Sequence, residues 1–362
     1  MSHFMKSGNT FKIAADAALD LYDHLPVGTY VVKQDMFKNF FLEAIEDFSF
    51  SGKIYGDTVK QRERIFNTFE TRKNSTGVLL NGEKGSGKTL LAKLLAIKAH
   101  ESGMPTIVIN TPWCGDEFNN FMQLISQPCM VLFDEFEKVY DKDEQAALLT
   151  LLDGVFSSKK LFVLTCNDKY RIDTHMRNRP GRIFYSMDFD GLSIEFIQEY
   201  CQDNLHDKSK IDGICKVSMA FSKFNFDMLQ AMVEEINRYG ETPQEAMRYL
   251  NAKPEYSESV TYDVALKVGG EPIKIENIQS HNRKLNINPL IVQRINIDYE
   301  VVTIDKDGEE DTDWEEARFS PADLAKVDIA TGTFVFKNSM GQELTLSREV
   351  DKSTKFHELL LV

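Results

Sequence analysis

The feature that most constrains the fold of this chain is a glycine-rich octapeptide between an apolar run and a helical run. Residues 82–89 read GEKGSGKT and satisfy the pattern G-x-x-x-x-G-K-[ST], after the apolar run 77–80 and before the helix-like run 90–96. In this strand, loop and helix context, backbone N–H groups can turn inward around a polyphosphate, and the helix N-terminus adds a favourable dipole. The sequence therefore predicts a phosphate-binding loop rather than a glycine-rich turn without a ligand.

The last two residues of this loop carry a positive charge and a hydroxyl group, which the loop backbone cannot provide. Lys88 would give a mobile cation to the β- and γ-phosphates, and Thr89 would offer a hydroxyl to Mg²⁺. We therefore expect ATP and Mg²⁺ as the ligands. The candidate nucleotide-binding residues of the loop are Gly82, Glu83, Lys84, Gly85, Ser86, Gly87, Lys88 and Thr89.

A second apolar run, residues 130–133, ends in the two acids Asp134 and Glu135. A buried parallel strand delivers the residues after its C-terminal end to the sheet edge where the phosphate loop lies. We expect Asp134 to hold Mg²⁺ through its water shell, and Glu135 to orient and deprotonate the attacking water. Two acids after a strand are common on surfaces, so it is their combination with the phosphate loop that favours a catalytic pair.

Two more motifs follow along the chain. The apolar run 161–166 ends at Asn167, which is either a turn residue or a neutral amide that holds the lytic water by hydrogen bonds. Three arginines then crowd into a short segment, Arg177, Arg179 and Arg182. The segment is either a basic surface loop, which could touch nucleic acid, or a source of guanidinium groups from Arg179 and Arg182 for the nucleotide of a neighbouring subunit.

The texture of the sequence predicts four regions. Alternating apolar and helical runs over residues 52–190 are typical of an α/β core with a buried parallel sheet. A leader region, residues 1–51, precedes it, with helical spacing over 11–25 and β-like runs at 28–33 and 40–48. The core strands are expected at residues 77–80, 106–109, 130–133, 161–165 and 184–187.

Beyond the core, helical periodicity over residues 191–252 predicts a small helical domain, and β-branched runs between turn residues predict a β-rich domain over residues 253–362. Residues 298–316 hold ten carboxylates and one lysine. This composition predicts a solvated loop or, as the alternative, an acidic surface for partner docking. The β-like runs of the last region are 260–268, 273–278, 290–304, 332–336 and 343–346.

Taken in order, these motifs resemble the AAA clade of the AAA+ ATPases over residues 54–252, including LLTLLDG at 148–154 and RPGR at 179–182. The resemblance implies a P-loop α/β domain and a helical lid, assembled in a ring, commonly a hexamer, with each ATP site at a subunit interface. It also implies roles for single residues. Lys88 and Thr89 resemble the Walker A pair, Asp134 and Glu135 the Walker B pair, Asn167 the sensor 1 residue, Arg179 and Arg182 the arginine fingers, and Tyr55 and Gly56 the adenine contact.

The sequence departs from the family in the loop, where Glu83 and Lys84 stand in place of two usual prolines. Residues 224–227 contain no arginine that could serve as sensor 2, which agrees with the AAA clade and disfavours clamp loaders and initiators. Trp113, Cys114 and Gly115 resemble the first pore loop of the family, where a ring of aromatic side chains grips a threaded polypeptide. The alternative is a tryptophan packed under a short loop.

Composition narrows the function further. Forty-two Lys and Arg against 56 Asp and Glu leave a net charge of −14, which disfavours a protein that coats nucleic acid by bulk charge. Five scattered cysteines without a C-x-x-C pair indicate a reducing compartment. The sequence has neither a secretion signal nor an apolar run of the roughly 18 residues that would predict a membrane span, so we expect a cytoplasmic protein.

The leading hypothesis is an ATP-hydrolysing ring that remodels or threads a protein substrate. Two alternatives remain open on the sequence. One is a nucleic-acid motor or loader, which is consistent with the arginine cluster at residues 177–182. The other is a nucleotide-gated scaffold that acts through the C-terminal β-rich region.

Overall fold

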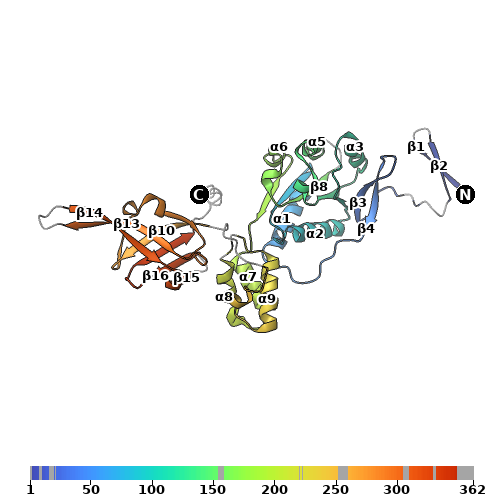
Figure 1. Ribbon diagram of the computed structural model, residues 1–362. Coiled ribbons are helices and arrows are strands. Elements are labelled where there is room, and N and C mark those ends of the chain that lie inside the picture. The colour runs from blue at the N-terminus through green and yellow to red at the C-terminus, as the bar shows by residue number, and fades with distance from the viewer. Residues whose placement is uncertain are drawn as a thin grey trace. The chain divides into compact units, whose positions relative to one another are not determined.

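The computed structural model forms two compact units, Met1–Asp190 and Gly191–Val362 (Figure 1). The structure describes residues 2–7, 10–15, 20, 22–153, 159–219, 221, 223–251, 260–304, 310–328 and 332–348.

The first unit is built on a seven-stranded sheet with the order β4-β3-β6-β7-β8-β5-β9. Every neighbouring pair is parallel except β3 and β4, which form a hairpin. All the core strands that the sequence predicts are present. The strands are β3 (Thr29–Gln34), β4 (Phe40–Ile45), β5 (Thr76–Gly82), β6 (Thr106–Ile109), β7 (Cys129–Phe133), β8 (Lys160–Cys166) and β9 (Tyr185–Phe189).

Helices cover both faces of this sheet (Figure 1). Along β7, Val131 and Phe133 pack with α3 and α5 on one face, while Met130 and Leu132 pack with α1 and α2 on the other. A strand buried on both faces needs an unbroken apolar run, which explains the uniform hydrophobicity of the core strands. The helices are α1 (Thr58–Thr71), α2 (Lys88–Glu101), α3 (Asp116–Leu124), α4 (Phe136–Val139), α5 (Lys142–Leu152), α6 (Thr174–Arg177) and the 3-10 turn η2 (Lys169–Arg171).

The β3–β4 hairpin joins the core sheet, although the sequence analysis assigned it to a leader region. Strand β3 runs parallel to β6, with Thr29 opposite Thr106 and Val31 opposite Val108. Its Val31 and Val32 are buried, so the hairpin is an integral edge of the α/β layer.

The helix expected over residues 11–25 is wrong where the structure describes this segment. Strand β2 (Thr10–Ala15) pairs antiparallel with β1 (Ser2–Ser7). In residues 10–13 apolar and polar side chains alternate, and this two-residue period competes with the helical spacing in so short a run. Residues 16–19 lie outside the described residues.

In the second unit, helices enclose one apolar cluster that includes Ile197, Leu229 and Met232. Helix α9 begins after Asn225, whose side chain accepts from the Met228 N–H, and ends at Gly240 in the left-handed conformation. The helices are α7 (Ile194–Asn204), α8 (Ile211–Ser218), α9 (Phe226–Tyr239), α10 (Pro243–Ala246) and the 3-10 turn η3 (Lys208–Lys210).

The rest of this unit is antiparallel. One sheet has the order β11-β10-β17-β16-β15, with β12 paired to β10, and β13 and β14 form a separate two-stranded ladder. The strands are β10 (Val260–Val268), β11 (Glu271–Pro272), β12 (Lys284–Ile287), β13 (Ile295–Ile304), β14 (Glu310–Phe319), β15 (Leu324–Asp328), β16 (Thr333–Lys337) and β17 (Glu343–Arg348), with the 3-10 turns η4 (Ile275–Asn277), η5 (Ser280–Asn282) and η6 (Pro321–Asp323).

Two expectations for this region are wrong. The run 273–278 is largely the 3-10 turn η4, not a strand. The acidic stretch 298–316 is not a loop over its described residues, because β13 and β14 pair there, with Tyr299 opposite Glu315. Side chains at alternate positions of these strands are buried on one face of the ladder, and acids such as Asp298 and Glu316 lie at the intervening positions. Residues 305–309 lie outside the described part of the chain.

Candidate active site

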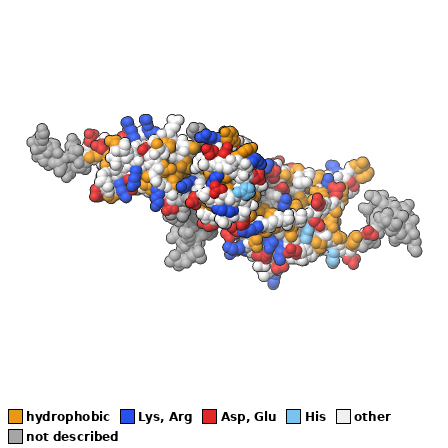
Figure 2. Space-filling model, turned by 90° about the horizontal axis from the view of Figure 1, so that it is seen from below, with side chains coloured by type: hydrophobic (Ala, Val, Ile, Leu, Met, Phe, Trp, Pro, Cys, Tyr) orange, Lys and Arg blue, Asp and Glu red, His pale blue; other side chains and the backbone are white. Residues whose placement is uncertain are grey.

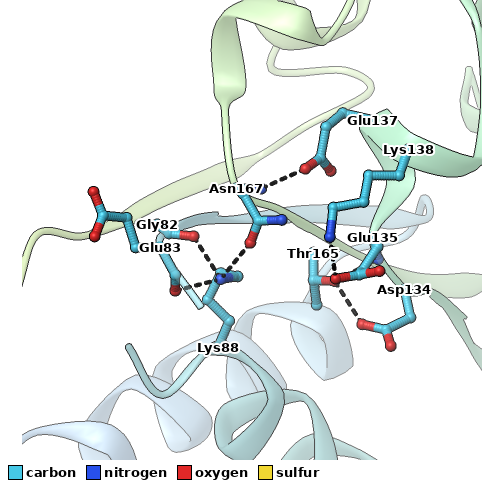
Figure 3. Close-up of polar contacts among 9 residues, drawn as sticks. All are labelled: Gly82, Glu83, Lys88, Asp134, Glu135, Glu137, Lys138, Thr165 and Asn167. Atoms are coloured by element: carbon cyan, nitrogen blue, oxygen red, sulfur yellow. Dashed lines mark hydrogen bonds and ion pairs between the residues drawn. The ribbon is translucent and has the colours of Figure 1, made fainter. Parts of the chain in front are cut away.

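Strands β5, β7 and β8 end at the same edge of the sheet. Their parallel register aligns Leu79 of β5 and Phe133 of β7 with Leu164 of β8. The loops that follow these strands therefore meet, and they carry the polar residues predicted from the sequence (Figure 3).

The loop after β5 has the backbone geometry of an anion cradle. Gly82 has φ +153°, and a Cβ added there would lie 2.5 Å from the Phe189 carbonyl oxygen, so only glycine fits. Helix α2 begins after Gly87, which has φ +103° and offers no side-chain cap to the first N–H groups. The buried Ser86 hydroxyl also has no partner within the described structure. A phosphate group would satisfy these donors, so the residues present fit a polyphosphate.

The Lys88 side chain is folded back into the loop (Figure 3). Its Nζ donates to the backbone oxygens of Gly82 and Glu83, the latter at 2.8 Å, and to Asn167 Oδ1 at 3.1 Å. Burial lowers the pKa of the Lys88 ammonium below its usual range, while nearby carboxylates, including Glu137, oppose this shift. The structure thus brings together the lysine and the asparagine that the sequence singled out.

The two acids after β7 are joined to β8 by one hydroxyl group. Thr165 Oγ1 donates to Asp134 Oδ1 at 2.7 Å and accepts from the Glu135 N–H at 2.8 Å. Glu135 has φ +49°, a left-handed conformation that is unfavourable for a side chain with a Cβ, and the hydrogen bond to Thr165 helps to hold it.

The Glu135 carboxylate faces Lys138, not solvent alone. Lys138 Nζ lies 2.5 Å from Glu135 Oε1, and both side chains are half exposed. This hydrogen bond from Lys138 lowers the pKa of the Glu135 carboxyl below its ordinary value, against an opposing effect of burial.

Sequence reasoning missed three residues of this network. Glu137 Oε1 accepts from the Asn167 N–H at 2.9 Å, so α4 fixes the backbone that carries the Asn167 amide. Thr165 and Lys138 are the other two. A polar residue inside an otherwise apolar strand was the available signal for Thr165; nothing in the local pattern marked Glu137 or Lys138.

The two predicted arginine fingers differ. Arg182 is buried; its Nε and Nη2 donate to the two carboxylate oxygens of Asp153 at 2.5 and 2.7 Å, and its Nη1 donates to the His175 carbonyl oxygen. These bonds use three of the five guanidinium N–H groups of Arg182 within its own chain, and its contact with a neighbouring nucleotide stays a prediction. Arg179 is 63% exposed and lies 3.8 Å from Asp153 Oδ1. Of the two, Arg179 presents its guanidinium to the outside.

Trp113 does not project from its loop. Its Nε1 donates to the Val32 carbonyl oxygen at 3.2 Å, and its ring packs edge-on against Phe40 with centroids 5.3 Å apart. Tyr140 donates its hydroxyl hydrogen to backbone oxygens on both sides of Pro112, at Thr111 and Trp113. The structure therefore favours the alternative of a packed tryptophan over a pore-lining one, and the neighbouring Cys114 and Gly115 are half-buried with it.

The remaining predicted residues lie around the loop. Thr89 is exposed on the first turn of α2, and Tyr55 and Gly56 precede α1, with Lys53 Nζ 5.0 Å from the centre of the Tyr55 ring. Among the described residues, no cluster of three or more His, Cys, Asp or Glu side chains could hold a metal ion alone. The donor set, one hydroxyl and one carboxylate, fits a Mg²⁺ ion that takes its other ligands from phosphates and water.

A glycine-rich cradle between a buried strand and a helix, with an acid pair after another strand of the same parallel sheet, defines the class of P-loop nucleotide-binding proteins. Residues 78–190 match the family model "ATPase family associated with various cellular activities (AAA)". This part of the chain is an AAA domain of the AAA+ type.

Two known proteins and one solved structure are similar to parts of this chain. The mouse "Nuclear valosin-containing protein-like" is 32% identical over 127 residues, which are 30% of this chain and 14% of that protein. An uncharacterized AAA domain-containing protein of Schizosaccharomyces pombe is 27% identical over 244 residues, 60% of this chain and 30% of that protein. A Thermotoga maritima RuvB structure aligns with 14% identity and a TM-score of 0.40, over 55% of this chain and 71% of that one.

The chain therefore spans less than a third of the length of these two relatives. No helix among the described residues is both long enough and apolar enough to cross a membrane.

Proposed function

We propose that this chain binds ATP with Mg²⁺, hydrolyses it, and uses the energy in a ring of subunits to remodel or thread a protein substrate. The observation that carries the proposal is the convergence of three loops at one sheet edge, where Lys88 contacts Asn167 and Thr165 links Asp134 to Glu135. The match of residues 78–190 to the AAA family model supports the same activity.

The residues divide the chemical work. Lys88 exchanges the loop carbonyls that it now contacts for the phosphates. Thr89 and Asp134 would hold Mg²⁺, which would supply positive charge to the phosphate oxygens. Glu135 turns away from Lys138 and takes a proton from the attacking water, which the Asn167 amide orients. Glu135 is ionised at neutral pH, and because its hydrogen bond with Lys138 lowers its pKa and so weakens it as a base, leaving Lys138 restores its ability to accept a proton.

Assembly would complete the site. The exposed Arg179 is the group that we assign to the nucleotide of the neighbouring subunit, where a planar guanidinium suits the charge that develops on the phosphoryl group. Arg182 is a positioning residue in this proposal, because it ties the same segment to Asp153. Residues 191–252 would act as the lid, and residues 1–51 and 253–362 would select substrate.

A protein substrate agrees better than nucleic acid with the charge distribution. Acidic and basic side chains are interspersed over the described part of the face drawn in Figure 2, which lacks one continuous basic surface. A protein that binds DNA through its phosphates gathers Lys and Arg on one face.

Glu135→Gln tests the proposed activity. The amide cannot accept the proton, so the turnover number should fall by about 100-fold or more while ATP still binds. Steady-state hydrolysis and binding of a fluorescent ATP analogue measure the two effects, and light scattering with ATP should find the variant trapped in a ring. Glu117→Gln, a change of an exposed acid on α3, is the matched control and should leave turnover unchanged.

Unfolded casein and single-stranded DNA are added separately to the unaltered chain. Stimulation of hydrolysis by casein alone supports a protein-remodelling ring. Stimulation by DNA alone would replace it with the nucleic-acid motor, and near-normal turnover in Glu135→Gln would remove Glu135 from the role of base.

A further inference from the structure

The tip of the β3–β4 hairpin exposes two large apolar side chains. Met36 is 89% exposed and Phe37 is 76% exposed. Large apolar side chains are ordinarily buried. These two adjacent side chains lie at the end of a hairpin and do not contribute to a hydrophobic core.

The turn that carries them is well ordered by hydrogen bonds. The Asp35 carboxylate accepts from the Phe37 N–H at 2.8 Å and from the Asn39 N–H at 2.9 Å, and the Asp35 N–H donates to the Asn39 carbonyl oxygen at 3.0 Å. Lys38 takes the left-handed conformation, with φ +65°. The turn is therefore a fixed support that holds Met36 and Phe37 outward, and its own carboxylate is consumed in building it.

The tip lies at the functional edge of the sheet. Because β3 is parallel to β6, its C-terminal end points beyond the same edge as the loop after β6 and the loops that hold the candidate site. The hairpin also touches the segment predicted as a pore loop, since Trp113 contacts Val32 and Phe40.

A chain of contacts joins the tip to the acid pair. Glu135 precedes α4, Tyr140 follows it, and the Tyr140 hydroxyl holds the backbone at Trp113, which in turn packs against Phe40 at the start of β4. Trp113, which the sequence suggested as a substrate-gripping residue, thus packs against the β3–β4 hairpin. The exposed apolar side chains lie at the tip of this hairpin.

We propose that Met36 and Phe37 form a substrate-contacting tip, which binds apolar side chains of an extended protein segment. This inference rests on the proposed function and names the element that would hold the protein substrate.

The chemistry of the tip favours an extended polypeptide over other occupants. Two side chains cannot bury the roughly 800 Å² per partner of a stable complex, so a permanent second subunit on the tip alone is disfavoured. Weak apolar contact, repeated by each subunit of a ring, gives a grip that does not depend on sequence. The net charge of −14 opposes attraction to an anionic membrane.

The test measures binding of fluorescein-labelled unfolded casein to the full chain by anisotropy, with ATP and without nucleotide. The double variant Met36→Ser, Phe37→Ser should bind casein about tenfold or more weakly, because two apolar contacts are lost. Leu124→Ser, which removes an 82% exposed apolar side chain at the end of α3, is the matched control and should bind within about twofold of the unaltered chain.

A photo-crosslinking residue in place of Phe37 identifies what the tip touches. Crosslinks to casein support the inference. Crosslinks only to a second copy of the chain, or binding to phosphatidylcholine and phosphatidylserine vesicles that the double variant loses while its casein affinity is unchanged, would overturn it.

Hydrolysis of ATP by the same preparations separates this inference from the proposed function. If the double variant hydrolyses ATP normally and binds casein with unchanged affinity, Met36 and Phe37 do not contact substrate, while the proposed ATPase activity still holds. The unaltered chain could instead bind casein but hydrolyse no ATP. If the double variant then lost casein binding, the role of Met36 and Phe37 would be supported and the proposed ATPase activity would be wrong.

Discussion

The functional edge of the seven-stranded sheet has two parts that are built in different ways. After β5, β7 and β8, the side chains that meet are polar, and hydrogen bonds through Thr165, Asn167 and Glu137 join one loop to the next. After β3 and β6, aromatic packing does the same work, with Phe40 and Trp113 at its centre. The polar part is called the nucleotide side below, and the aromatic part the hairpin side.

The difference teaches where each kind of substitution should act. Hydrogen bonds on the nucleotide side orient groups that are themselves partly exposed, so their loss should change the rate of a reaction more than the stability of the fold. Packing on the hairpin side buries apolar surface, so its loss should change local stability first.

The sharpest way to test the nucleotide side is to remove the Thr165 hydroxyl. Thr165→Val keeps the size of the side chain and deletes both hydrogen bonds to the acid pair. We expect the turnover number to fall by roughly 30- to 100-fold, since two orienting hydrogen bonds of about 1 kcal/mol or more each are lost, with little change in ATP affinity. Steady-state kinetics and binding of a fluorescent ATP analogue measure these quantities.

Thr165→Ser is the matched control, because it restores the hydroxyl and loses only a methyl group. Its turnover should stay within about threefold of the unaltered chain. If the serine and valine variants were equally slow, Thr165 would be acting through packing, and the contrast between the two sides would fail.

On the hairpin side, Trp113→Ala should destabilise β3 and β4. The variant loses the edge-on contact with Phe40 and the hydrogen bond to Val32. For a half-buried tryptophan we expect a loss of about 2 kcal/mol, or roughly 30-fold less protection of the β3 amides against hydrogen exchange. Mass spectrometry of exchanged peptides measures it, and Phe37→Ser should leave the same amides unchanged.

The opposite result would restore the prediction made from the sequence. If Trp113→Ala kept full amide protection yet lost stimulation of hydrolysis by casein, Trp113 would be a substrate-gripping residue after all.

The smallest effect concerns the pH dependence of the nucleotide side. Lys138 lowers the pKa of Glu135, so the base stays ionised to a lower pH than an ordinary glutamate. In Lys138→Met this pKa should rise, and the acid limb of the pH profile of kcat/KM, which reports the free enzyme, should move to higher pH. Lys142→Met, an exposed lysine at the start of α5, should leave the limb in place. An unmoved limb in both variants would mean that a group other than Glu135 titrates there.

Much of this structure could be predicted from local patterns. The phosphate loop needs glycine at Gly82 and Gly87 because of backbone geometry, and strands buried on both faces require unbroken apolar runs, so both leave a plain signal in the sequence. The positions of the buried strands then predict where these strands end. They therefore also predict that Lys88, Asp134 and Asn167 lie close together at one edge of the sheet.

Other features depended on contacts between distant residues, which no local pattern encodes. Whether an arginine is exposed, as Arg179 is, or spent on an acid, as Arg182 is on Asp153, depends on what lies opposite in the fold. The same holds for Trp113, whose position is set by Phe40 in a strand far away along the chain.

The amino-acid sequence by itself predicted the class of ligand and the edge of the sheet where we propose that it binds, because loop geometry and strand burial act over a few consecutive residues. Only the tertiary structure decided which aromatic side chains are buried and which remain outside, that β3 and β4 extend the core sheet, and that the described residues of the acidic stretch form a paired ladder. Those outcomes depend on burial and pairing between segments that meet only when the chain has folded.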